Sequence, residues 1–206
     1  MRKIIGLFIF IISYQASKAQ QFAFELWHEG KAVLESGDTL RGLIKYEQSQ
    51  DMKQDIIQVK VKSQMMSYSP RKVLFFEIFD TTAKRYRQFY SLPYSENNTY
   101  KSPVFFELLV EGKLTVLCRE RLEYRTVNNS INYFYGSSRQ LMLVMAYFLL
   151  KPDGTISDFE GRKNNWLRLM DAREREVKGF AKDNKLDFEN KYELARIIEY
   201  YNSLIK

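Results

Sequence analysis

The residue types that most often carry out acid–base or nucleophilic chemistry are scarce in this sequence. The chain contains one histidine, His28, and one cysteine, Cys118. A cysteine nucleophile needs a base beside its thiol, but the two residues lie far apart in the chain. Cys118 follows the apolar residues 114–117 and is expected to pack as a small hydrophobic side chain. We expect His28 to be a surface or hydrogen-bonded histidine, and we predict no catalytic residues.

The sequence also lacks the usual motifs of metal and phosphate sites. A single histidine and a single cysteine exclude the usual zinc ligand sets. An all-oxygen calcium site remains possible, although Asp51 with Asp55, and Asp153 with Asp158, lack the alternating acids of a calcium loop. The sequence contains no glycine-rich phosphate loop and no Gly-x-Ser-x-Gly motif. It therefore predicts neither a bound metal nor a cofactor.

Aromatic side chains are the remaining candidates for binding, because Phe, Trp and Tyr make up 15% of the chain. They gather around the predicted loop 93–103 and again at 133–135. Such rings can stack on sugars or fill a pocket of a partner protein, and they can equally fill a core. The candidate ligand-binding residues are Tyr90, Tyr94, Tyr100, Tyr133 and Tyr135.

The elements that must position these residues change type along the chain. Residues 20–160 are mainly β, with alternating patterns and turn residues such as Gly37-Asp38. Hairpins are expected around 36–38 and 111–113, and residues 93–102 are expected to form a loop. The predicted strands cover 22–27, 31–35, 39–46, 56–62, 65–68, 73–79, 85–92, 104–110, 114–119, 122–127 and 155–159.

The apolar run 140–150 is ambiguous. Its periodicity cannot distinguish a core helix from a buried strand over 140–146. The turn-forming residues 151–154 favour a strand at least from Tyr147 to Leu150. The run is too short for a transmembrane helix, which needs about 20 apolar residues.

After Gly161 the pattern becomes helical. We predict a short helix over 166–170, and a second that opens with a capping box formed by Asp171 and Glu174. A third helix is predicted to be capped by Asp187. Each helix has one apolar stripe that must cover the β part. The fold class is therefore α+β, with an N-terminal antiparallel sheet or barrel-like part followed by about three helices.

The first 19 residues have the pattern of a secretory signal peptide. Arg2 and Lys3 precede a short apolar run, and Ser17 and Ala19 have the small side chains that signal peptidase requires. We expect cleavage before Gln20, which leaves residues 20–206 as a single domain. The mature protein would then be periplasmic or secreted.

Size and charge set further limits. Cleavage would remove three cations and no acid, so the formal charge falls from +7 to +4. The remaining Lys and Arg residues alternate with acids, which argues against a nucleic-acid partner. One cysteine cannot form an internal disulfide.

Several motifs together resemble exported proteins of unknown function from Bacteroidota-type bacteria. These are the hairpin 37–46 (GDTLRGLIKY), the hairpin 110–114 (VEGKL), the turn 147–154 (YFLLKPDG) and the sequence EYYN at 199–202. The resemblance covers most of the mature chain. It implies export and provides no catalytic residues.

The preferred hypothesis is an exported, non-catalytic module that binds an envelope protein or glycan. One alternative is an envelope hydrolase that uses paired carboxylates among the 25 acidic residues. The other is a structural subunit that assembles through β-edge pairing and forms a concentration-dependent oligomer.

Overall fold

The structure, a computed structural model, describes residues 23–48, 55–95, 100–127 and 138–205. The predicted signal segment 1–19 and its cleavage position lie outside these residues. Within the described part, none of the helices is both long and apolar enough to cross a lipid bilayer.

The β part is one ten-stranded sheet in which every neighbouring pair is antiparallel. Its spatial order is β10-β9-β8-β7-β6-β5-β1-β2-β3-β4. Two meanders, β1 to β4 and β5 to β10, are therefore joined edge to edge by β1 and β5. The strands are β1 (His28–Leu34), β2 (Thr39–Glu47), β3 (Ile56–Val61), β4 (Gln64–Tyr68), β5 (Val73–Asp80), β6 (Arg85–Tyr94), β7 (Ser102–Val110), β8 (Thr115–Val127), β9 (Ser138–Leu150) and β10 (Ile156–Phe159).

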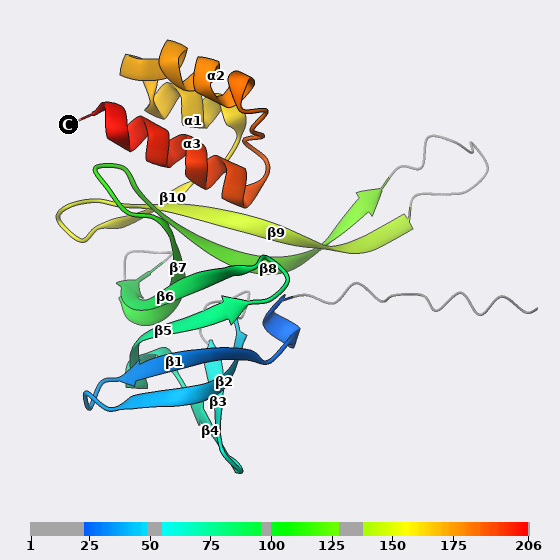
Figure 1. Cartoon of the computed structure of the whole chain (residues 1–206), viewed down its shortest axis with the longest axis vertical. Coiled ribbons are helices and arrows are strands. Elements are labelled where there is room, and N and C mark those ends of the chain that lie inside the picture. Colours follow the sequence, from blue (N-terminus) through cyan, green and yellow to red (C-terminus); the bar gives the residue numbers. More distant parts are fainter. Residues whose placement is uncertain (1–22, 49–54, 96–99, 128–137, 206) are drawn as a thin grey trace, which may run out of the picture.

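Figure 1 shows β1 to β4 at one end of the sheet and β8 to β10 beside the helices. The sheet coils so that the end of β2 nevertheless reaches β8. The Tyr46 hydroxyl donates a hydrogen bond to Glu120 at 2.8 Å. The concave side, which we call the inner face, encloses an aromatic core that includes Phe76, Phe89 and Phe105. Phe76 and Phe89 stack with ring centroids 4.5 Å apart. The sheet is thus barrel-like but ends at β4 and β10.

Strands β7 and β8 separate beyond Glu107 and Cys118, the last pair in their shared register. Phe105 has no backbone partner on β8, and two side chains bond its amide and carbonyl instead. Asp55 accepts a hydrogen bond from the Phe105 amide at 3.2 Å, and Arg119 donates to its carbonyl at 2.5 Å. Asp55 and Arg119 also pair through two hydrogen bonds of 2.6 and 2.9 Å. Backbone groups left unpaired in a core are costly, so this buried pair stabilises the separation of the strands.

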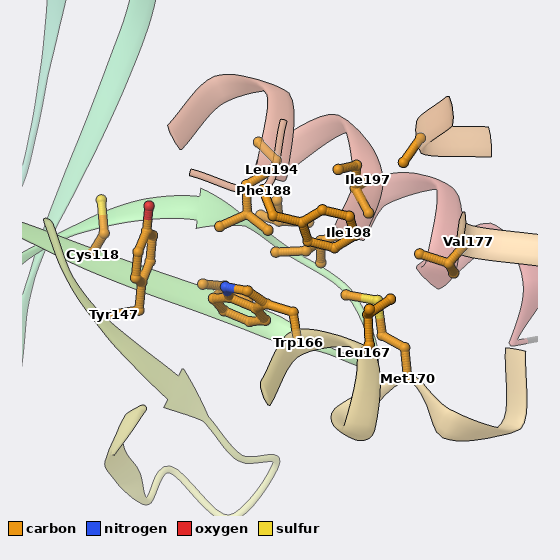
Figure 2. Packing of buried hydrophobic residues seen from close by; sticks show 14 residues of the cluster. Cys118, Tyr147, Trp166, Leu167, Met170, Val177, Phe188, Leu194, Ile197 and Ile198 are labelled. Carbon is orange, nitrogen blue, oxygen red and sulfur yellow. The ribbon is translucent and has the colours of Figure 1, made fainter. Parts of the chain in front are cut away.

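Three helices cover the inner face of the C-terminal strands: α1 (Lys163–Leu169), α2 (Glu174–Asp183) and α3 (Lys191–Leu204). Figure 2 shows Trp166 and Ile198 among the residues that fill the space between helices and sheet. The Trp166 ring meets Tyr147 edge to face at 5.5 Å. The α+β prediction, with an N-terminal sheet followed by C-terminal helices, is confirmed.

The structure also decides the ambiguous apolar run. Residues 138–150 form the single strand β9, which pairs with β8 along its whole length. β8 is likewise continuous, where two strands were expected. β6 extends through Pro93 and Tyr94, where a loop was expected, because these residues pair with the beginning of β7.

Three local predictions were wrong. Residues 23–25, expected within a strand, form a 3-10 turn (Ala23–Glu25). Asp171 lies in another 3-10 turn (Asp171–Arg173) and forms no capping box, and α2 has no side-chain cap. The cap of α3 is Asn190, whose side chain accepts hydrogen bonds from two backbone amides, and not Asp187. Asp187 instead accepts from the Glu189 amide at 2.9 Å.

Candidate functional site

The tyrosines predicted to contact a ligand do not share one environment. Tyr90 is half-buried on β6, with its ring 5.0 Å from that of Phe75. Tyr100 is 71% exposed. Tyr133 and Tyr135 lie outside the described residues. For these four residues, ligand contact stays a prediction.

The structure corrects the placement of Tyr94. Its side chain is only 5% exposed and packs edge to face against Phe106 and Phe148. Its hydroxyl donates a hydrogen bond to Asp158 at 2.7 Å. Pairing of residues 93 and 94 with β7 draws the ring into the core, so Tyr94 stabilises the fold and does not contribute to an exposed patch.

His28 and Cys118 do not form a catalytic pair. The His28 ring is buried between two backbone carbonyls, with Nε2 2.6 Å from the Ala23 oxygen and Nδ1 3.3 Å from the Phe79 oxygen. Burial, with the nearby charge of Glu107, raises the pKa of Cys118 well above its ordinary value. A buried thiol of this kind is a poor nucleophile.

The aspartates considered for calcium are engaged elsewhere. Asp51 lies outside the described residues, and Asp55 forms the buried pair with Arg119. Asp153 accepts a hydrogen bond from the Thr155 amide at 2.8 Å in an exposed turn. Throughout the described part of the chain, no three His, Cys, Asp or Glu side chains lie close enough together to hold a metal ion.

Five charged side chains converge on the inner face between the sheet and α3, and we call them the buried charge cluster. Arg87 donates to both oxygens of Glu107, at 3.0 and 2.6 Å. It also donates to Glu120 at 2.7 Å and to Asp80 at 3.0 Å. From α3, Lys191 Nζ reaches Glu107 at 3.0 Å and Glu120 at 2.8 Å. No member of the cluster is more than 7% exposed.

The cations of this cluster keep its carboxylates ionised. Burial opposes the charged form of Glu107, but the attraction of Lys191 and Arg87 outweighs it and lowers the pKa of Glu107 to about 2. The same balance lowers the pKa of Glu120. A glycosidase pair needs one protonated carboxyl as general acid. The cluster does not provide one, and its chemistry is that of a structural ion-pair network.

Sequence reasoning did not identify this cluster. Arg87 lies in the basic run 84–87, and Glu107 lies within the otherwise apolar strand 104–110. The sequence signal that could have indicated the cluster is the strand face on which these two charges fall. By the two-residue period of a strand, Arg87 falls on the same face as Phe89, and Glu107 falls on the same face as Phe105.

The opposite side of the sheet, which we call the outer face, contains a depression of about 800 Å³ over β1, β2, β3, β5 and β6. Antiparallel pairing sets Lys31 beside both Arg41 and Glu77, and Leu43 beside Lys60. The described residues that line the depression are Glu29, Gly30, Lys31, Arg41, Gly42, Leu43, Lys60, Lys62, Glu77, Phe79 and Tyr86.

Positive charge exceeds negative charge in this depression. Lys31 pairs with Glu77 at 3.2 Å, and Gln88 donates to the other oxygen of Glu77 at 3.0 Å. The hydrogen bond from Gln88, with contributions from Lys31 and Arg41, lowers the pKa of Glu77. Among the described residues, the exposed cations Arg41, Lys60 and Lys62 have no carboxylate within 4.0 Å. They remain available for a ligand.

Two paired glycines give the depression its floor. Gly30 and Gly42 lie opposite each other in the β1–β2 register. A Cβ atom at Gly30 would lie 2.1 Å from the Glu77 carbonyl oxygen, and one at Gly42 would lie 2.2 Å from that of Lys60. The neighbouring strands therefore approach more closely than any side chain would permit.

An aromatic pair borders the same depression. Phe79 and Tyr86 are opposite each other on β5 and β6, with ring centroids 5.1 Å apart. Tyr86 is 67% exposed. The outer-face depression thus combines an exposed ring with cations that have no ion-pair partner among the described residues. Comparison of the chain with protein-family models, curated proteins and solved structures finds no match.

Proposed function

We propose that this chain is an exported envelope protein that binds an acidic glycan, without catalysis, in the outer-face depression. The observation that carries the proposal is a group of three cations, Arg41, Lys60 and Lys62, which have no ion-pair partner in the part of the chain that the structure describes and lie beside the exposed ring of Tyr86. Export is supported by the signal-like pattern of residues 1–19.

The cations favour an anionic ligand. Arg41 and Lys60 project from neighbouring strands, and Lys62 follows directly after β3. A carboxylate on a ligand can therefore contact more than one cation. A guanidinium binds a carboxylate through two parallel hydrogen bonds, whereas an ammonium acts as a point charge.

The aromatic pair favours a ligand with flat apolar surfaces. Sugar rings present C–H faces that pack on tyrosine, and Tyr86 is exposed beside the cations. Leu43 contributes further apolar surface at 37% exposure. A uronate-containing glycan has both the charge and the ring surface that this face accommodates.

The hydrolase alternative would require an acid and a base in the same depression. Glu29 and Glu77 line it, but both oxygens of Glu77 are engaged by Lys31 and Gln88. The lowered pKa of Glu77 keeps this carboxyl charged. We therefore propose binding without cleavage.

Calorimetric titration with hexagalacturonate tests the proposal, with neutral cellohexaose as the control glycan. We expect binding of the acidic oligomer only. The charge reversals Arg41→Glu and Lys60→Glu should each weaken binding about ten-fold or more, because they replace attraction by repulsion. The matched control Lys182→Glu, on the exposed side of α2, should change it less than about two-fold.

Three outcomes would contradict the proposal. The first is no binding of the acidic glycan, and the second is equal weakening by Lys60→Glu and Lys182→Glu. The third is release of shorter oligomers from hexagalacturonate, which would support the hydrolase instead. A further outcome would also contradict the proposal. If single-stranded DNA bound more tightly than the glycan and the same variants weakened that binding, the ligand would be a nucleic acid and not a glycan.

A further inference from the structure

The ribbon formed by the far ends of β8 and β9 has an open edge. These ends extend away from the rest of the sheet (Figure 1). β10 pairs with β9 only over residues 147–150. In the described part of the chain, residues 138–146 of β9 therefore have β8 on one side and no strand on the other.

The two strands of the ribbon differ in side-chain chemistry. On β8, Glu123 pairs with Arg121 at 2.6 Å and with Arg125 at 3.5 Å. On β9, residues 141–146 are all apolar. Leu141 and Met142 are 39% and 41% exposed although they alternate between the two faces.

Charged side chains on an edge strand discourage pairing with another chain, and an apolar edge without them invites it. By this criterion the β8 edge is protected and the β9 edge is not. Both faces of β9 present apolar surface, so an added strand would gain side-chain contacts as well as backbone hydrogen bonds.

We propose that residues 138–146 of β9 pair antiparallel with the same residues of a second copy of this chain, about a two-fold axis at Met142. This window is set by the structure, since β10 occupies the edge from residue 147 onward. The register places Leu141 opposite the partner's Leu143, and Met142 opposite its own counterpart.

The charge distribution makes the strand complementary to itself. Arg139 is the only charged residue between positions 138 and 150. In the antiparallel pair the two Arg139 side chains lie at opposite ends, where each is opposite the partner's Met145. No like charges meet, which is the requirement for an edge that pairs with its own copy.

In the described part of the chain, the ribbon has one apolar open edge, and this also limits assembly through the ribbon. A two-fold contact uses the same surface on both copies and closes on itself. Because the β8 edge is charged, the described residues of this ribbon offer no second apolar edge that could extend a fibre. The expected product is a dimer with a sheet that continues from one copy into the other.

Sedimentation over a range of protein concentrations tests the proposal with a matched pair of variants. Leu141 and Tyr124 are cross-strand partners of the ribbon. Leu141→Lys places a charge on the open edge and should weaken dimerisation about ten-fold or more. Tyr124→Lys makes an equivalent change on β8 and should weaken it less than about two-fold.

A second measurement does not depend on either lysine variant. Met142→Cys places two thiols opposite each other at the axis, so oxidation should yield a covalent dimer. Gln140→Cys, opposite the partner's Val144, should yield about ten-fold less. Cys118 is buried and should not contribute.

A strictly monomeric chain would overturn the proposal, as would equal weakening by Leu141→Lys and Tyr124→Lys, or equal crosslinking of the two cysteine variants. The ribbon lies apart from the outer-face depression. Failure of glycan binding with dimerisation intact, or the reverse, would therefore separate this proposal from the proposed function.

Discussion

Charged residues of the same types are buried and paired on the inner face of the sheet, and exposed in the depression of the outer face. On β6, Tyr86 points to the outer face and Arg87 to the inner face. Arg87 is buried with every donor group directed at a carboxylate. The cations of the outer-face depression are exposed, and three of them have no acidic partner among the described residues.

This difference shows that burial determines what a charge does. A buried charge must be paired, because transfer from water costs several kcal/mol, and its partners then fix one arrangement of the strands. An exposed charge contributes little to stability and keeps its capacity to attract a ligand. The buried charge cluster of the inner face therefore holds the fold together, and the outer-face depression is available for binding.

The largest expected effect is at Arg87. Arg87→Met leaves Lys191 as the one cation of the buried charge cluster, in contact with Glu107 and Glu120 but not with Asp80, and should lower the free energy of unfolding by about 3 to 5 kcal/mol. Urea denaturation of the purified chain measures this value. A loss below about 1 kcal/mol would show that the buried charge cluster is not a structural centre.

Acid should act mainly on the inner face. The pKa of Glu107 is lowered to about 2 in the folded chain, below its ordinary value of 4.5. Its contribution is therefore fully present above about pH 4.5 and is lost as pH falls toward 2, by about 3 kcal/mol in all. Melting temperatures between pH 6 and pH 3 measure the loss. In Glu107→Gln the melting temperature should fall less steeply with decreasing pH. An unchanged pH dependence would assign the acid sensitivity to other carboxyls.

The smallest stability effect is expected on the outer face. Arg41→Met removes an exposed cation that has no ion-pair partner in the described part of the chain, and should change the free energy of unfolding by less than about 0.5 kcal/mol. Urea denaturation beside Arg87→Met gives the comparison directly. A loss as large as that of Arg87→Met would mean that both faces serve stability, and the contrast between them would fail.

The hairpins were accessible from the sequence because their signals are local. Gly37 adopts φ +90°, as the predicted turn requires, and the strands on either side have the expected alternation. The helical stripes after Gly161 were equally clear. These patterns depend on residues a few positions apart, where backbone geometry alone fixes which side chains share a face.

The candidate sites were not accessible in the same way. Lys191 and Glu107 meet across 84 positions of the chain, and neither carries a local signal of its partner. The outer-face depression joins cations from β1, β2 and β3, which only strand order brings together. Tyr94 was assigned to a loop because Pro93 suggests one, yet pairing with β7 places its ring in the core.

The amino-acid sequence by itself determined the order of the β-rich and helical parts and the positions of the glycine turns. It also determined that His and Cys, the usual nucleophiles and metal ligands, are scarce. The tertiary structure decided which charges are buried, that 138–150 is a strand, and which strand edge is left open. These depend on contacts between distant segments, whose free energy exceeds the local preference of any single residue.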